Sequence, residues 1–249
     1  MRQNYIVTSF NKRLLDEYAR NFLDTYLEHN IPADLYVYVE DDVSNYIEYH
    51  NSNIKFINLF EEDPECFNFV SRHSANKVEN YKFDAVRFCY KVFAQYVGAT
   101  RICSRRMFWI DADCVFVKPI PEEWFEQVLD NSVVAFFDRP NFYSECGFIG
   151  YDTLHPGCSS FLSKFRAMYV NDDIFGLKEY HDSYVFDVVR KWAVTGLGLD
   201  YRETKLGNPE GDLHIMARDP QVSPYIDHKK GPRKSQEHSP EWLRYNNAR

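Results

Sequence analysis

Apolar residues occur along the chain either in short continuous runs or at helical spacing, and the two patterns predict where strands and helices lie. Three runs rich in β-branched and aromatic residues are typical of strands: 5–10, 34–39 and 54–59. Between the first two runs, apolar residues from 14 to 26 recur at helical spacing, and Asn11 is a candidate N-cap. This order of strand, helix, strand and strand favours an α/β domain with a largely parallel sheet.

The clearest helical pattern lies between residues 83 and 97. Its apolar residues are spaced by three and four positions and form one stripe: Phe83, Val86, Tyr90, Phe93 and Val97. Arg87 and Lys91 fall off this stripe, so we expect them on the polar face of the helix. Gly98 is predicted to end the helix.

The rest of the chain continues the alternation and shows no repeat or linker. Strands are predicted at 107–110, 114–117, 133–137 and 147–151, and helices at 124–129, 161–169 and 184–192. Residues 40–65 carry many acids and almost no bases, so we expect a solvated loop region there. Nothing divides the chain, which favours one domain over residues 1–249.

Composition narrows the class of protein. Hydrophobic residues make up 45% of the chain and charged residues 27%, which argues against disordered, collagen-like and coiled-coil proteins. A net charge of −8 gives no general attraction to nucleic acid or an anionic membrane. No apolar stretch approaches the roughly 20 residues that span a bilayer, and no signal-peptide pattern opens the chain, so we expect a cytoplasmic protein without integral membrane contact. The six cysteines form no CxxC pair and are predicted to be reduced thiols.

Two acids interrupt an apolar part of the chain. Asp111 and Asp113 stand on either side of Ala112, between the apolar runs 107–110 and 114–117. Charges are rarely placed in a buried strand without a partner, and carboxylate oxygens are ligands that Mg²⁺ and Mn²⁺ prefer. We therefore predict that the pair holds a divalent cation that bridges a diphosphate. The alternative is a strand edge where both acids face water.

The end of the chain is basic although the protein is acidic. Residues 227–249 hold six Lys or Arg against three Asp or Glu. His228 can offer an imidazole to a metal, Gly231 allows close backbone approach to an anion, and Lys234 can act as a point charge on phosphate. Composition alone favours a solvated tail. Together with the two acids upstream, the segment describes a nucleotide-diphosphate site.

Four segments spread over most of the chain resemble family 8 of the GT-A glycosyltransferases, the retaining enzymes that include glycogenin and bacterial lipopolysaccharide galactosyl- and glucosyltransferases. They are residues 5–11, 108–113, 145–151 and 228–234, and the last has the family's HxxGxxK pattern. The resemblance implies a Rossmann-like α/β GT-A fold with a mixed, mostly parallel sheet flanked by helices. It also implies a nucleotide-binding part over residues 1–117 and an acceptor part over residues 118–249.

The same resemblance assigns the cation and the donor diphosphate. It implies that Asp111, Asp113 and His228 bind Mn²⁺ or Mg²⁺. It implies that Gly231 and Lys234 hold the diphosphate, to which Asp111 also contributes.

Further residues are assigned to the rest of the donor. The resemblance implies that Thr8 and Ser9 lie near the nucleoside. Arg87 matches a basic residue that contacts the donor, and Lys82 is a second candidate for that role. An exposed charge on the polar helix face is the alternative for Arg87.

Two acids are candidates for the reacting centre. Asp182 resembles the family's acid that binds the donor sugar near the reacting carbon, although a helix N-cap is an alternative role. Glu145 stands where the family usually has asparagine, and Ser183-Tyr184 stands where it often has Gln-Asp. These departures indicate a divergent branch. If the reaction uses a covalent intermediate, Asp182 and Glu145 are the candidate nucleophiles.

These features predict a metal-dependent glycosyltransferase that moves a hexose or pentose from a nucleoside-diphosphate sugar, a UDP-sugar, to an acceptor hydroxyl. Retention at the anomeric carbon is implied by the resemblance alone. The acceptor is open: a glycan, a lipid-linked saccharide, a protein or a modified DNA base. A nucleotidyltransferase is an alternative, disfavoured because residues 8–13 contain no glycine. A non-catalytic sugar-nucleotide-binding subunit is another, disfavoured by the intact Asp111, Asp113 and His228.

Overall fold

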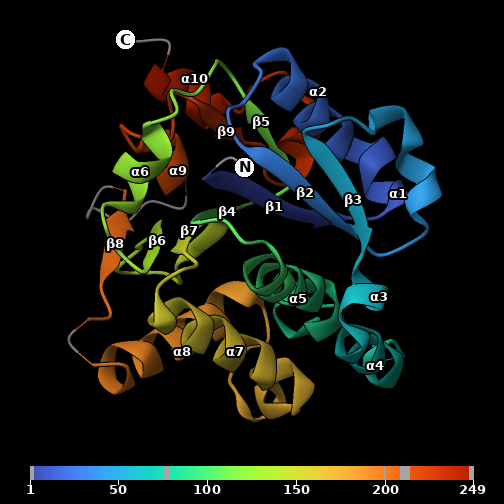
Figure 1. Ribbon diagram of the computed structural model, residues 1–249, viewed down its shortest axis with the longest axis vertical. Helices are drawn as coiled ribbons and strands as arrows, with labels where there is room; N and C mark the ends of the chain where they lie inside the picture. Colours follow the sequence, from blue (N-terminus) through green and yellow to red (C-terminus); the bar gives the residue numbers. More distant parts are fainter. Residues whose placement is uncertain (1–2, 76–78, 199, 208–213, 247–249) are drawn as a thin grey trace.

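The computed structural model describes residues 3–75, 79–198, 200–207 and 214–246, and its centre is a mixed seven-stranded sheet (Figure 1). In spatial order the strands are β3 (Ile54–Asn58), β2 (Asp34–Val39), β1 (Asn4–Phe10), β4 (Arg106–Ile110), β7 (Glu145–Asp152), β6 (Val134–Phe137) and β8 (Glu203–Leu206). The first four run parallel, and β6 is parallel to β8. Only β7 is antiparallel to both of its neighbours in this sheet. The predicted α/β fold with a mostly parallel sheet is confirmed.

Helices cover both faces of the sheet, as is usual for parallel sheets. One face packs against the long helices α4 (Pro64–His73), α5 (Ala85–Arg101), α7 (Pro156–Val170) and α8 (Asp182–Gly196) (Figure 1). The other face packs against α2 (Arg20–Glu28), α6 (Trp124–Leu129), α9 (Ile215–Arg218) and a small sheet of β5 (Cys114–Phe116) with antiparallel β9 (Ile226–His228). Shorter elements are α1 (Lys12–Leu14), α3 (Leu59–Glu62), α10 (Pro240–Asn246), and turns of helix over Leu15–Ala19, Val43–Tyr49, Tyr81–Phe83, Asp173–Gly176 and Gly231–Ser235. None of the helices in the described ranges is both long and apolar enough to cross a membrane.

Several local predictions are confirmed. The Asn11 side chain accepts a hydrogen bond from the Leu14 amide at 3.0 Å, so it caps the first helix as its residue type favours. All six cysteines are free thiols, and five of them are buried. The strands and helices of the middle of the chain lie within a few residues of their predicted positions.

Two local predictions are wrong. Gly98 does not end its helix, because α5 continues to Arg101. A Cβ at Gly98 would lie 2.8 Å from Val7 Cγ2, so this glycine lets the helix approach β1 closely. The region 40–65 is not mainly a solvated loop, since it contains a 3₁₀ turn with buried Tyr46, strand β3 and helix α3.

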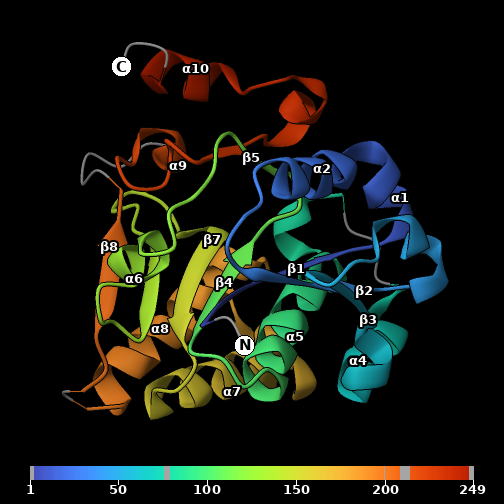
Figure 2. The same cartoon turned by 45° about the horizontal axis from the view of Figure 1, so that its top comes forward.

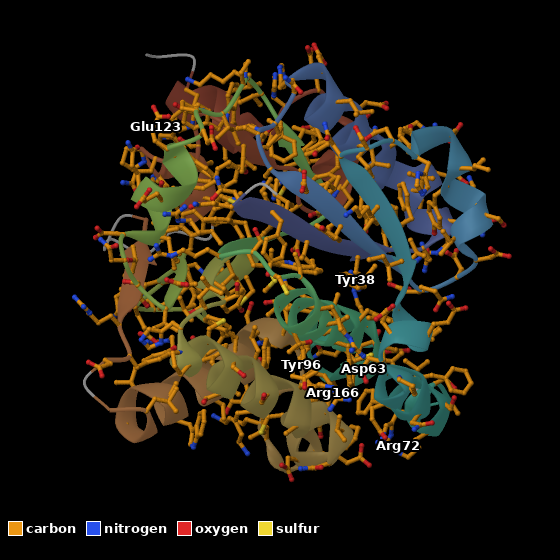
Figure 3. The ribbon with its side chains drawn as sticks, viewed as in Figure 1. Tyr38, Asp63, Arg72, Tyr96, Glu123 and Arg166 are labelled. Carbon is orange, nitrogen blue, oxygen red and sulfur yellow. The ribbon has the colours of Figure 1, made fainter. Side chains whose placement is uncertain are left out.

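A partly buried ion pair joins the helices that pack on one face of the sheet. Arg166 of α7 points at Asp63, the N-cap of α4 (Figure 3), and its Nε and Nη2 each lie 2.6 Å from a carboxylate oxygen. Asp63 is only 4% exposed, and the guanidinium also lies 4.9 Å from the ring centre of Tyr96 on α5. One side chain therefore ties three helices together on the same face.

The C-terminal segment contributes one strand of the small sheet. Figure 2 shows α10 at the outer edge of the molecule, next to α9, and the stretch that joins them passing beside α2. Strand β9 pairs with β5 so that His228 stands opposite Cys114. This pairing places the predicted HxxGxxK segment directly beside the predicted DxD acids.

Candidate functional site

An open cleft of about 670 Å³ lies where the parallel strands β1, β2 and β4 end. Its wall includes Ser9 of β1, Glu40 after β2 and Asp111 after β4. The N-terminal turns of α5 and the first residue of α8 form another part of the wall, and Lys234 closes it from the chain end. Ligands of open α/β sheets bind at the carboxyl ends of the strands, so the position is that of a binding site.

Six predicted site residues line this cleft: Ser9, Arg87, Asp111, Asp113, Asp182 and Lys234. The other five lie outside its lining: Thr8, Lys82, Glu145, His228 and Gly231. Thr8 is fully buried one residue before Ser9, and Gly231 begins the turn that carries Lys234. Gly231 has a φ of +60°, a backbone conformation that glycine adopts without strain.

At Asp113 the middle of the chain meets the C-terminal segment. His228 Nε2 lies 3.0 Å from Asp113 Oδ1, and Lys234 Nζ lies 3.1 Å from Asp113 Oδ2. Its backbone carbonyl accepts a hydrogen bond from the Lys229 amide at 3.0 Å. Burial disfavours the charged carboxylate, but His228 and Lys234 outweigh it and hold the pKa of Asp113 well below its usual range. Asp113 is therefore an anion at neutral pH.

The group around Asp113 fits a divalent cation. Ligand atoms of Asp113, Cys114 and His228 lie within 4.8 Å of one another. Asp113 Oδ1 and His228 Nδ1 are buried and make no hydrogen bond to the described residues. Burial raises the pKa of the Cys114 thiol, so it stays protonated and is a poor ligand. A carboxylate and an imidazole remain, and both suit Mn²⁺.

Asp111 faces a different partner. Its Oδ1 accepts hydrogen bonds from Lys91 Nζ at 2.8 Å and from Trp109 Nε1 at 2.6 Å. Lys91 Nζ also lies 2.8 Å from Asp182 Oδ2, so one ammonium joins the two acids. The structure thus places Asp111 in the cleft but outside the cation group formed by Asp113 and His228.

Lys91 is a site residue that the sequence pattern placed wrongly. We expected it on a polar helix face, but it is only 8% exposed. Burial disfavours its charge, yet the carboxylates of Asp111 and Asp182 outweigh burial and raise the pKa of Lys91. Lys91 of α5 lies against β7, where its Nζ donates a hydrogen bond to the Cys146 carbonyl oxygen at 2.5 Å. A helical pattern alone cannot show such a second contact.

Asp182 stands at the start of α8, but it does not cap the helix. The N-cap is His181, whose Nδ1 accepts a hydrogen bond from the Tyr184 amide at 3.4 Å. The predicted capping role of Asp182 is therefore wrong by one residue. The Asp182 side chain instead forms an ion pair with Lys91 and lines the cleft.

Glu145 is enclosed behind the cleft. Its carboxylate contacts Lys230 Nζ, lies 3.4 Å from Arg139 Nη1 and accepts a hydrogen bond from the Gly147 amide at 3.1 Å. Burial disfavours its charge, but Lys230, His228 and Arg139 prevail and lower the pKa of Glu145 to about 2. The Glu145 carboxylate is thus ionised, and its ion pair with Lys230 binds the C-terminal segment to β7.

Glu40 is a cleft residue that sequence reasoning missed. It follows β2 directly, and its Oε2 accepts a hydrogen bond from Asn11 Nδ2 at 3.0 Å. Burial raises the pKa of Glu40 to about 7, and the nearby Asp41 adds to this effect. Glu40 has the feature that singled out Asp111 in the sequence, an acid directly after an apolar run. It was not recognised because many other acids follow it, and the whole stretch was assigned to a solvated loop.

The predicted donor contacts divide between cleft and surroundings. Arg87 lines the cleft and is exposed. Lys82 is held outside by Glu179, whose Oε1 lies 3.1 Å from its Nζ. Tyr18, which helical spacing assigned to the first helix, also lines the cleft, and Lys234 Nζ lies 3.7 Å from its ring centre. Such a cation–π contact holds the lysine at the cleft mouth.

Acids outnumber bases in the cleft lining. The acids are Glu17, Glu40, Asp84, Asp111, Asp113 and Asp182, and the bases are Arg13, Arg87, Lys91 and Lys234. An acidic cleft repels a polyphosphate unless positive charge is added. The cation group is the place in the described residues where such charge fits.

Comparison with known proteins identifies the fold. No protein-family model and no curated protein sequence matches the chain. The apo form of mouse xyloside xylosyltransferase 1 has a similar structure, with a TM-score of 0.50 and 14% identity over 82% of this chain and 85% of that one. The glycosyltransferase GlyE of Streptococcus pneumoniae TIGR4 has a TM-score of 0.51 and 12% identity over 82% of this chain and 45% of its own. The chain therefore has the GT-A glycosyltransferase fold, as the resemblance implied.

Proposed function

We propose that the chain is a glycosyltransferase that uses a nucleoside-diphosphate sugar, a divalent cation and an acceptor hydroxyl. One observation carries the proposal. Asp113 and Lys234 line a cleft of the GT-A fold and His228 contacts Asp113 from behind it, although more than a hundred residues separate Asp113 from the other two. Retention and a UDP-sugar donor belong to the proposal on the strength of the resemblance to family 8.

The excess of acids in the cleft supports the need for a cation. Asp113 and His228 would hold Mn²⁺ or Mg²⁺. Asp111, which the resemblance also assigns to the cation, is bound by Lys91 in this structure, so it would act from outside the Asp113–His228 group. The ion would supply Lewis-acid stabilisation of charge on the departing diphosphate. Lys234, now paired with Asp113, lies at the same place and adds a positive charge for the phosphates.

The remaining cleft residues order the rest of the donor. Ser9 and Glu40 stand at the ends of β1 and β2, where they accept hydrogen bonds from nucleoside hydroxyl or N–H groups. Asp182 lines the cleft at the start of α8 and accepts hydrogen bonds from sugar hydroxyls. Lys91 holds the carboxylates of Asp111 and Asp182 in fixed positions by forming an ion pair with each. It is a positioning residue for this site.

Donor hydrolysis tests the proposal without the unknown acceptor. The purified chain is incubated with a panel of nucleotide sugars and Mn²⁺, Mg²⁺ or a chelator, and the released nucleoside diphosphate is measured. We expect release from one donor, dependent on metal. Asp113→Asn should lower it by about 10² or more, because the variant loses the anionic ligand.

A matched variant separates this effect from a general loss of charge. Asp16→Asn changes an acid that is 53% exposed and pairs with Lys12 on the surface, so it should leave release unchanged. Circular dichroism and thermal melting check that both variants fold. Release that survives Asp113→Asn or the chelator would overturn the metal assignment. Release of pyrophosphate in place of nucleoside diphosphate would establish a nucleotidyltransferase.

A further inference from the structure

Aromatic rings from four separate segments gather around one histidine beside the cleft. The ring centre of His181 lies 4.9 Å from that of Tyr143, 6.2 Å from those of Tyr81 and Phe88, and 6.3 Å from that of Tyr184. Tyr143 and Tyr184 also contact each other edge to face at 5.2 Å. We call these five residues the aromatic platform.

The platform is continuous with the cleft. Phe88 belongs to both, since it lines the cleft and contacts His181. His181 directly precedes Asp182, which lines the cleft and pairs with Lys91. A molecule resting on the platform therefore borders the part of the cleft that we assign to the donor sugar.

The platform is not a closed core. Tyr81 is 54% exposed, and Phe88, Tyr143 and Tyr184 are only partly buried. Lys82 Nζ lies 5.7 Å from the ring centre of Tyr143, and Arg87 Cζ lies 5.7 Å from that of Phe88, so Tyr81 offers the most exposed ring of the five. An exposed ring gains free energy when an apolar surface covers it. The C–H faces of a pyranose ring provide such a surface, while its hydroxyls need polar partners at the edge.

Polar partners stand beside the rings. Glu179 accepts hydrogen bonds from Lys82 Nζ at 3.1 Å and Tyr143 OH at 2.9 Å, and its Oε2 lies 2.8 Å from His181 Nε2. Burial disfavours its charge, but these three groups outweigh burial and lower the pKa of Glu179. The carboxylate stays ionised and keeps lone pairs for hydroxyl donors.

The charges of this region favour a neutral ligand. Glu179 neutralises Lys82, so that lysine offers no unpaired positive charge for phosphate groups. Nucleic-acid surfaces need such charges, because phosphate contacts supply most of their non-specific affinity. Rings with a balanced ion pair suit a saccharide better than a polynucleotide.

We propose that the aromatic platform is the subsite for a saccharide acceptor, with a sugar ring stacked on Tyr81 and its neighbours and its hydroxyls bound by Glu179. The proposal rests on the glycosyltransferase function and adds the class of its acceptor. In the transfer, the acceptor hydroxyl forms the new bond to the anomeric carbon, the diphosphate leaves with the electron pair of the broken bond, and the hydroxyl proton passes to the leaving diphosphate.

The test uses methyl glycosides of glucose, galactose, xylose and N-acetylglucosamine as acceptor probes. Saturation-transfer NMR measures their binding to the unaltered chain, and coupled assays measure how much each raises nucleoside-diphosphate release above donor hydrolysis. We expect binding of at least one glycoside with transfer from protein aromatic protons, and a saturable rise in release. Absence of saturation transfer from every glycoside would overturn the proposal, as would a rise in release only with an oligonucleotide that carries hydroxymethylated pyrimidines.

Variants separate stacking from a structural effect. Tyr81→Ala should raise the KM for the glycoside about tenfold, the loss expected for one stacked ring, with a smaller change in kcat. Tyr81→Phe keeps the ring and should restore the KM. Phe67→Ala is the control, because Phe67 has the same 54% exposure but lies on α4 outside the platform. An unchanged KM in Tyr81→Ala would refute the subsite.

The two proposals fail in different ways. Donor hydrolysis by the unaltered chain needs no acceptor, so its absence counts against the glycosyltransferase function. Glycoside binding measured by NMR needs no turnover, so its absence counts against the subsite alone.

Discussion

Replacing Glu40 by glutamine should stabilise the protein at neutral and alkaline pH, and should have little effect in acid. Burial at the end of β2 raises the pKa of this carboxyl from 4.5 to about 7 in the folded state. The folded protein therefore binds the proton more tightly than the unfolded chain. Below pH 4.5 the group is protonated in both states and costs nothing. As the pH rises from 4.5 through 7, the unfolded chain ionises first and stability falls.

The size of this effect follows from the two pKa values. A difference of one unit between the pKa values of a group in the folded and unfolded states corresponds to about 1.4 kcal/mol. The gap between 4.5 and about 7 thus corresponds to about 3 kcal/mol of lost unfolding free energy above neutral pH. Glutamine has nearly the same shape and can still accept the hydrogen bond from Asn11 Nδ2, so Glu40→Gln removes the charge and little else.

Urea unfolding of both proteins at several values between pH 4.5 and 8.5 measures the effect as a difference in free energy of unfolding. The variant should match the unaltered protein at pH 4.5 and exceed it by up to about 3 kcal/mol at pH 8.5. The other titrating groups are the same in both proteins, so their contributions to the free energy of unfolding cancel in the difference. Glu17→Gln is the control, because that cleft carboxylate is 50% exposed and should change stability by less than about 0.5 kcal/mol. A constant difference between Glu40→Gln and the unaltered protein would refute the reasoning from burial.

Two further variants test the inner side of the site. Lys91→Met leaves the buried carboxylate of Asp182 and the partly buried carboxylate of Asp111 without their cation, and should cost about 3 kcal/mol of unfolding free energy. Lys12→Met on the surface should cost less than about 0.5 kcal/mol, and chemical unfolding compares the two variants. Gly147→Ala places a Cβ 2.4 Å from His228 Cε1, so the imidazole must move. It should weaken Mn²⁺ activation of donor hydrolysis at least tenfold in a metal titration, whereas Gly176→Ala, with nothing within 4 Å, should not. Equal Mn²⁺ activation curves for the two alanine variants would show that moving the His228 imidazole does not weaken metal activation.

Local patterns predicted the elements well, because each depends on residues close in the chain. Runs of β-branched and aromatic residues predicted the strands β1 to β4, and helical spacing predicted helix α5. Asn11 caps the first helix as expected. Where a second surface covers an element, the pattern misleads. Gly98 looked like a helix end but is a point of close packing against Val7.

The site shows the same division. The sequence by itself determined the residue types that suit a cation and a diphosphate, since the Asp111–Asp113 pair and the HxxGxxK segment are each recognisable within a few residues. It also determined that Asp111 and Asp113 lie between two strands, because apolar runs adjoin them on both sides, whereas strand β9, which ends at His228, was not predicted.

Only the tertiary structure decided which of these groups meet. Strand β9 pairs with β5 and brings His228 and Lys234 to Asp113, while the packing of α5 on the sheet sends Lys91 between Asp111 and Asp182. The ionised state of each buried group depends on such partners, because burial alone would disfavour its charge. Partners contributed by distant segments leave no mark in a local pattern, so the charge balance of the cleft and the aromatic platform beside it became visible only in the folded chain.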